Sequence, residues 1–318
     1  MAVLKTRFAC MHQHLLALVV LSACSLLHTS LNAGTLVRIN TPLGGVTLDL
    51  FDTVAPNTVN NFLNYVNSGR YNNTFIHRSE VSPTPFVIQG GWLQFDEPSQ
   101  NLQSIPVFGN IPNEFRTSNT RGTVAMAKQA GNPDSANSQW FVNLANNSFL
   151  DLDNGGFTVF GRIVDNGMTV IDAIAALPRF ILLQQLPTVP LINFNTALPL
   201  KTENLVTVTM AVMTHPSAHP NVFDTTMNLL YTKVNTGADG LLGLVFAVHS
   251  LAPQVVLQAL PSTLTILSTP VAKMAEFNGS NGRITIPEFI VNGEIAFRNV
   301  VLEVLDANLL LFRLVSFE

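Results

Sequence analysis

The chain has 318 residues, of which only 11% are charged, and its formal net charge at pH 7 is −4. A single hydrophobic core rarely grows far beyond about 250 residues before a chain divides into domains, so this length predicts two folding units. The few charges, acidic in sum, leave no basic face that could release counterions from nucleic acid, so we expect no nucleic-acid partner.

Residues 1–33 have the pattern of an export signal. Lys5 and Arg7 give a positively charged start, and the apolar run Leu15–Ala23 is short for a segment that spans a bilayer. The sequence therefore predicts a signal peptide over residues 1–33 and an exported protein of the periplasm or cell envelope.

Two cleavage sites compete at the end of this leader. A small-residue site ends at Ala33, whereas Leu21–Cys24 resembles the lipobox of bacterial lipoproteins, in which the signal ends at residue 23. In the second alternative Cys24 is acylated and anchors the protein to a membrane. Cys10 and Cys24 are the only cysteines of the chain, so disulfides and cysteine-ligated zinc are excluded after the leader.

After the leader, the pattern first predicts a β-hairpin and then a helix. Apolar residues alternate along Val46–Leu50, and Thr41–Gly45 supplies turn residues between this strand and Leu36–Ile39. Pro56 suits the first turn of a helix and Gly69 suits its end. Apolar residues recur between them at the spacing of one helical face, at Val59, Phe62, Leu63 and Val66.

A second helix and a closing strand complete the first predicted domain. The helix is expected over Met168–Ala176, and after a proline-punctuated stretch the run Leu205–Val212 has the pattern of a strand. His215–Pro220 contains prolines that cannot continue a strand ladder, so it is a natural linker. We therefore expect a mainly β first domain with two helices at residues 34–213.

Residues 214–318 predict a smaller, β-rich C-terminal domain of unknown role. Leu241–Val248 is an apolar run with the length of a buried strand. Several more strands are expected between Arg283 and Phe317, around the hairpin dipeptide Asn292-Gly293.

Several short motifs follow one another in the first domain. Phe75-Ile76-His77-Arg78 precedes Phe86-Val87-Ile88-Gln89-Gly90-Gly91. The later motifs are Arg121–Ala127, Ser138–Phe141, Phe149–Asp151 and Val159–Gly161. In order and spacing, over about 180 residues, these motifs resemble those of the cyclophilins, a family of peptidyl-prolyl cis-trans isomerases.

The resemblance implies a fold and an activity. The fold is an eight-stranded antiparallel barrel capped by two helices, and the substrates are proline-containing polypeptides, here those of the cell envelope. Isomerisation is a rotation about the amide C–N bond, so no nucleophile, metal or cofactor is needed. We expect a monomer that assists the folding of exported proteins.

The resemblance also assigns roles to residues of the predicted site. Arg78 matches the catalytic arginine, and Gln89 is expected to hydrogen-bond Arg78 or the substrate. Ala127 and Lys128 are expected to present backbone groups to the substrate. The remaining substrate-binding residues are expected to be Phe86, Val87, Gln139, Phe141, Phe149, Leu150 and Phe157.

The sequence departs from the family's pattern near these residues. Three more residues than usual separate Arg78 from Phe86, which predicts a longer turn. Val87 replaces a common Met, Lys128 a common Asn, Phe149 a common Trp, and Phe157 a His or Tyr. Because Phe149 lacks an indole N–H donor, we expect weak cyclosporin binding.

An alternative interpretation is a binding module rather than an enzyme. In that case the protein is a chaperone or surface lipoprotein that grips proline-containing segments, with weak or no isomerase activity because of the lengthened turn.

Overall fold

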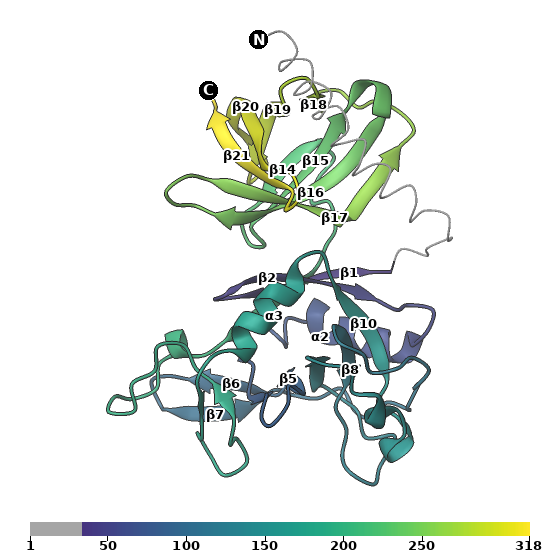
Figure 1. The fold of residues 1–318 in the computed structure, drawn as a ribbon, viewed down its shortest axis with the longest axis vertical. Helices are drawn as coiled ribbons and strands as arrows, with labels where there is room; N and C mark the ends of the chain where they lie inside the picture. Colours follow the sequence, from purple (N-terminus) through teal and green to yellow (C-terminus); the bar gives the residue numbers. More distant parts are fainter. Residues whose placement is uncertain (1–33) are drawn as a thin grey trace. The chain divides into compact units, whose positions relative to one another are not determined.

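The computed structural model describes residues 34–318, which form two compact units that divide between Met213 and Thr214. Figure 1 shows the strands and helices of both units. The predictions about the signal peptide and Cys24 lie outside the described residues. Within residues 34–318, no helix combines the length and the apolar character that crossing a membrane requires.

The first unit begins with the predicted hairpin. Strands β1 (Leu36–Thr41) and β2 (Gly44–Leu50) pair antiparallel, with Thr41 opposite Gly44. The Oγ1 of Thr41 donates to the carbonyl of Gly44 at 2.8 Å and holds the turn. The hairpin prediction is therefore confirmed.

Two helices pack on the first unit, as the apolar spacing predicts. Helix α2 (Pro56–Asn67) has its proline in the first turn and buries Val59, Phe62 and Val66. Helix α3 (Gly167–Ala175) buries Ile171 and Ile174. Glu114 accepts hydrogen bonds at the start of α2, and it is far from this helix in the sequence.

An eleven-stranded sheet forms most of the first unit, in the order β4-β5-β9-β8-β10-β2-β1-β13-β3-β6-β7. The strands not yet given are β3 (Thr74–Phe75), β4 (Arg78–Glu80), β5 (Val87–Gly90), β6 (Leu93–Asp96), β7 (Asn101–Ser104), β8 (Thr123–Met126), β9 (Trp140–Asn143), β10 (Val159–Val164) and β13 (Thr207–Val212).

This sheet curves back on itself like a barrel. Strand β3 pairs with β13 and β6, while β4, which follows β3 after only Ile76 and His77, pairs with β5. The expectation of eight strands differs from the eleven that the structure has. Part of the difference arises because the β3–β4 and β5–β6 stretches are each interrupted, the second at Gly91 and Trp92.

The proline-punctuated stretch between α3 and β13 packs against β3 and β6 of this sheet. It contains the short strands β11 (Arg179–Phe180) and β12 (Val189–Pro190), which pair with each other. Its buried residues form a small core with Phe75 and Leu93. The 3-10 turns of the described residues are η1 (Ser148–Asp151), η2 (Asp153–Gly155), η3 (Thr202–Asn204) and η4 (Gly237–Asp239).

The second unit is an eight-stranded sheet in the order β14-β15-β16-β17-β21-β20-β19-β18. The strands are β14 (Asn221–Asp224), β15 (Leu229–Asn235), β16 (Leu241–Ser250), β17 (Val256–Leu267), β18 (Ala275–Asn278), β19 (Arg283–Val291), β20 (Glu294–Asp306) and β21 (Leu311–Ser316). Asn292 and Gly293 join β19 to β20 with φ values of 53° and 85°, so the hairpin predicted from this dipeptide is confirmed.

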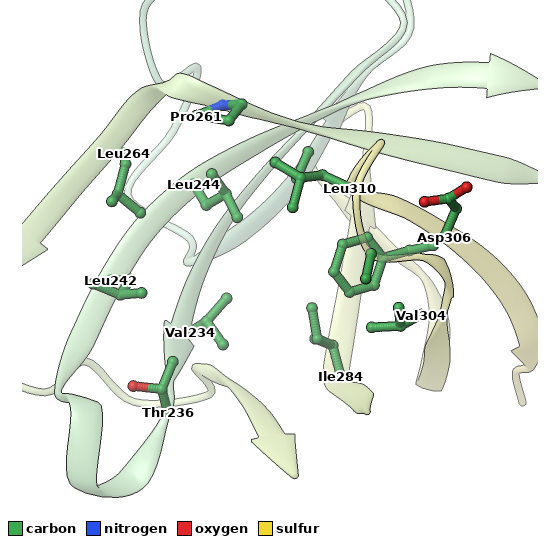
Figure 2. A pocket seen from close by; sticks show the side chains of 13 residues that line it. Val234, Thr236, Leu242, Leu244, Pro261, Leu264, Ile284, Val304, Asp306 and Leu310 are labelled. Carbon is green, nitrogen blue, oxygen red and sulfur yellow. The ribbon is translucent and has the colours of Figure 1, made fainter. Parts of the chain in front are cut away.

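The second unit has a hydrophobic core of its own, which includes Leu230, Phe246 and Phe312. Next to this core lies an apolar cavity of about 40 Å³. Figure 2 shows that side chains such as Leu242 and Ile284 line it.

Candidate active site

A row of cross-strand neighbours brings residues of several motifs of the first unit together. Arg78 on β4 lies opposite Gln89 on β5, and Gln89 lies opposite Phe141 on β9. The row continues through Ala125 on β8 to Val159 on β10. Because residues directly opposite each other share one face of a sheet, this row sets a guanidinium and an amide beside an apolar surface.

The polar end of the row is a chain of hydrogen bonds. The Nη1 of Arg78 donates to the Oε1 of Gln89 at 3.1 Å, and the Nε2 of Gln89 donates to the Oε1 of Gln139 at 2.8 Å. The Nε of Arg78 also donates to the Oε1 of Glu80 at 3.2 Å. The Arg78 side chain remains 41% exposed, so the guanidinium is fixed yet accessible to a ligand.

The apolar end of the row is a separate hydrophobic cluster. Its buried members are Val87, Ala125, Phe141, Leu150 and Val159, and Phe51, Phe86, Ala127 and Phe157 are partly buried against it. Phe86 stacks on Phe149 with ring centroids 5.6 Å apart, and the Cζ of Arg78 lies 5.9 Å from the Phe86 ring. The Arg78 guanidinium therefore lies beside this hydrophobic cluster.

The lengthened turn between Arg78 and Phe86 does not disturb this arrangement. The backbone N–H of Phe86 donates to the carbonyl of Glu80 at 2.9 Å, which closes a loop over residues 81–85. Beyond this loop, strands β4 and β5 pair in a regular register in which Glu80 lies opposite Val87. The extra residues therefore lie in the loop, and Arg78 keeps its place beside the cluster.

Comparisons with known proteins identify the family. Residues 36–191 match the family model described as "Cyclophilin type peptidyl-prolyl cis-trans isomerase/CLD". A peptidyl-prolyl cis-trans isomerase of Acinetobacter baylyi is 41% identical over 150 residues, which cover 46% of this chain and 74% of that protein. The chain belongs to the cyclophilin family.

Two further relatives are also peptidyl-prolyl cis-trans isomerases. Peptidyl-prolyl cis-trans isomerase A of Dickeya dadantii is 43% identical over 143 residues, covering 44% of this chain and 71% of the relative. Peptidyl-prolyl cis-trans isomerase B of Escherichia coli is 40% identical over 146 residues, which cover 44% of this chain and 83% of that relative. This cyclophilin is a peptidyl-prolyl cis-trans isomerase, and cyclophilins bind proline-containing peptides.

The family match ends inside the first unit of this cyclophilin. It stops at residue 191, whereas β13, at residues 207–212, pairs with both β1 and β3. The stretch from residue 192 to β13 therefore belongs to the barrel-like unit although it lies outside the family match. Residues 214–318, which form the second unit, also lie outside the match.

The structure bears on the backbone of Ala127 and on the side chain of Lys128, two residues whose backbone groups are expected to face the substrate. The backbone N–H of Ala127 donates to the carbonyl of Gln139 at 2.9 Å, so this donor is already used within the protein. The Nζ of Lys128 donates to the carbonyls of Asn154 and Gly156 at 2.7 and 2.6 Å, and it lies 4.8 Å from the Phe157 ring centroid. Partial burial lowers the pKa of Lys128.

The expected substrate-binding aromatics lie in different environments. Phe141 is buried and contacts Phe157 edge-on, with 5.8 Å between ring centroids, whereas Phe149 is 59% exposed. Gln139 accepts from Gln89 and not from Arg78, so of the two glutamines Gln89 is the direct partner of the arginine.

Three residues of this neighbourhood have no role in the sequence-based prediction: His77, Glu80 and Thr188. His77 is buried, and desolvation together with the neighbouring Arg78 charge lowers its pKa from 6.5 to about 4. Glu80 follows Arg78 by two positions on the same strand, and this spacing places both side chains on one face. The sequence could therefore have predicted that Glu80 lies near Arg78, whereas no sequence pattern predicts the position of Thr188.

The acidic turn at Asp151 serves the fold. Its carboxylate accepts the backbone N–H of Asn119 at 2.9 Å and the hydroxyl of Ser118. Within residues 34–318, no three His, Cys, Asp or Glu side chains gather closely enough to hold a metal ion.

Proposed function

We propose that this cyclophilin isomerises X-Pro bonds of exported polypeptides, with Arg78 stabilising the transition state electrostatically. The observation that carries the proposal is the accessible Arg78 guanidinium, bound to Gln89 and continuous with the apolar cluster around Phe86, Phe141 and Leu150. A proline ring is apolar and its peptide nitrogen is polar, so such an arrangement offers each part a suitable contact.

The chemical problem is the rotation of an amide bond. The C–N bond has partial double-bond character, with a barrier of about 18–20 kcal/mol, and uncatalysed X-Pro exchange takes tens to hundreds of seconds. In the twisted transition state the nitrogen lone pair is no longer delocalised and becomes a hydrogen-bond acceptor. A guanidinium that donates to this nitrogen stabilises the transition state and not the ground state, which accelerates the rotation.

The Arg78 role is tested by isomerisation of a short X-Pro peptide. A hydrogen bond to a charged group contributes about 1.5–3 kcal/mol, so Arg78→Ala is expected to lower kcat/KM by about 10- to 100-fold. Arg116→Ala, which changes an arginine outside the cluster, serves as a control for the loss of one positive charge. An Arg78→Ala variant as active as the wild type would contradict the mechanism.

We further propose that the protein acts in the periplasm or cell envelope as a monomer. Support for export comes from the positive and apolar pattern of the leader, with lipidation at Cys24 as one alternative. Labelling of cells with a radioactive fatty acid tests the anchor: label that disappears in Cys24→Ala supports it, and an unlabelled wild type removes it. Cell fractionation tests the location, and sedimentation of the purified protein tests the monomer.

A further inference from the structure

The Arg78 guanidinium is held from two sides. Besides the Nη1 bond to Gln89, its Nε donates to the Oε1 of Glu80 at 3.2 Å. These bonds use one N–H of Nη1 and the only N–H of Nε, so three of the five N–H groups, one on Nη1 and two on Nη2, remain to donate to a ligand. Glu80 is therefore placed to set the plane of the guanidinium.

Glu80 is itself fixed by main-chain contacts. Its carbonyl accepts the N–H of Phe86 at 2.9 Å, at the base of the loop over residues 81–85. It is paired opposite Val87 in the β4–β5 ladder, and its side chain is 27% exposed.

A second contact orients the Glu80 carboxylate. The Oγ1 of Thr188 donates to the Oε1 of Glu80 at 3.0 Å, the same oxygen that accepts from Arg78. Thr188 is placed by its own main chain, because its carbonyl accepts the N–H of Ser79 at 2.9 Å and the next residue, Val189, is fully buried. The order of contacts is thus Thr188 to Glu80 to Arg78.

We propose that Glu80, oriented by Thr188, is a positioning residue that holds the guanidinium of Arg78 in its working orientation. This inference rests on the proposed role of Arg78 in the isomerisation. The stretch after α3 that carries Thr188 thereby acquires a part in catalysis, although it does not contribute a group to the hydrophobic cluster.

Two effects of Glu80 on Arg78 oppose each other. As a hydrogen-bond acceptor it restricts a long side chain, and misplacement of a reacting group by about 1 Å can lower a rate by about 100-fold. As an anion it offsets part of the positive charge that favours the transition state. Glu80→Gln keeps an acceptor oxygen and removes the charge, whereas Glu80→Ala removes both, so the two variants separate the effects.

The experiment measures kcat and KM for isomerisation of an X-Pro peptide with the purified protein. We expect Glu80→Ala to lower kcat by about tenfold with KM changed by less than about twofold, and Glu80→Gln to stay within about twofold of wild type. Thr188→Val, which keeps the side-chain shape without the hydroxyl, is expected to lower kcat by about threefold. Asp172→Ala, which breaks the exposed ion pair with Arg121, is the matched control and should leave kcat unchanged.

The double variant Arg78→Ala/Glu80→Ala shows whether Glu80 acts through Arg78. If it does, Glu80→Ala has no further effect once Arg78 is absent, because the two substitutions remove one interaction. Additive losses would overturn the inference, as would a fully active Glu80→Ala or a Glu80→Gln as impaired as Glu80→Ala. An inactive wild type, or an Arg78→Ala variant with full activity, would instead overturn the proposed function itself.

Discussion

The imidazole of His77 is buried beside the arginine of the site, where a charge is unfavourable. Its side chain lies edge-on to Trp92, with ring centroids 5.4 Å apart, and its Nδ1 has no hydrogen-bond partner within the described part of the chain. With a pKa of about 4, His77 is neutral at pH 7 and does not add a second positive charge next to Arg78. His77 therefore leaves the Arg78 guanidinium as the positive charge of this pair.

This burial makes stability depend on pH. The folded-state pKa of His77 is lowered from 6.5 to about 4, so between these values the unfolded chain takes up a proton that the folded chain does not. The free energy of unfolding should thus decrease as pH falls, by about 2 kcal/mol from this residue between pH 7 and pH 5. Urea denaturation should show a smaller decrease in His77→Asn, whereas the exposed-site variant His219→Asn should keep the wild-type decrease. Equal decreases in all three would contradict the prediction.

Phe149 sets the expected response to cyclosporin. It is 59% exposed and stacks on Phe86, so a larger ring can be accepted there without repacking. Phe149→Trp supplies an indole N–H, and a neutral hydrogen bond contributes about 0.5–1.5 kcal/mol, so cyclosporin affinity should rise by about 2- to 13-fold over a weak wild type. Calorimetric titration measures both proteins, with Phe149→Tyr as a control that lacks the indole. A wild type that already binds with nanomolar Kd would be inconsistent with this view.

At the scale of single residues, the motifs predicted which side chains gather but not every partner. Arg78, Gln89 and Phe141 lie in one row because short motifs on adjacent strands are placed opposite each other by strand pairing. The contact between Glu80 and Thr188 spans 108 positions and depends on how an irregular stretch returns to β4, which periodicity does not describe.

Helix α2 is an element whose start depends on a remote residue. Its N-cap, Ala55, makes no side-chain capping bond. The Glu114 carboxylate instead accepts the backbone N–H groups of Asn57 and Thr58 at 3.2 and 2.8 Å, together with the Thr58 hydroxyl at 2.8 Å. A negative charge at this end also interacts favourably with the helix dipole.

Glu114→Ala should therefore destabilise the first unit. Loss of a helix cap typically costs about 0.5–2 kcal/mol, and we expect a decrease of about 1–2 kcal/mol in the free energy of unfolding because a charge is lost as well. This free energy of unfolding is measured by chemical denaturation, with circular dichroism as the probe. Glu203→Ala, which removes an exposed carboxylate 3.6 Å from Lys201, should change the same quantity by less than about 0.5 kcal/mol. A similar small change in both variants would argue against the cap.

The elements themselves were predictable where a local pattern decides them. Both helices and the two hairpins at Thr41–Gly44 and Asn292-Gly293 follow from helical spacing, strand alternation and turn residues. The number of strands could not be predicted in this way. β3 and β4 are separate strands because the pairing partner changes from β6 to β5 between them, and this change of partner is a property of the closed sheet.

At the scale of the whole molecule, each unit has its own core. The core of the first unit includes Phe62, and that of the second includes Phe246, whose side chain is fully buried and contacts Phe312 edge-on with 5.3 Å between ring centroids. The division between Met213 and Thr214 lies next to the proline-containing stretch His215–Pro220.

Substitutions in the two cores should have separate effects. Phe246→Ala is expected to cost the second unit about 3–5 kcal/mol, while kcat/KM for peptide isomerisation stays within about twofold of wild type. Phe62→Ala, the matched change in the first unit, should lower both stability and activity. Thermal unfolding and the peptide assay on the full chain test this together, and a Phe246→Ala protein that loses activity at a temperature where the first unit remains folded would refute the separation.

The pairing of the strands in the second unit has a further consequence, for contacts with extended polypeptides. Its terminal strands in pairing order, β14 and β18, each have a second, parallel partner, in β19 and β15. A strand paired along only one side offers a row of free N–H and C=O groups to any extended polypeptide nearby. By pairing these two strands again, the unit reduces the backbone surface on which a client could be captured and begin to aggregate.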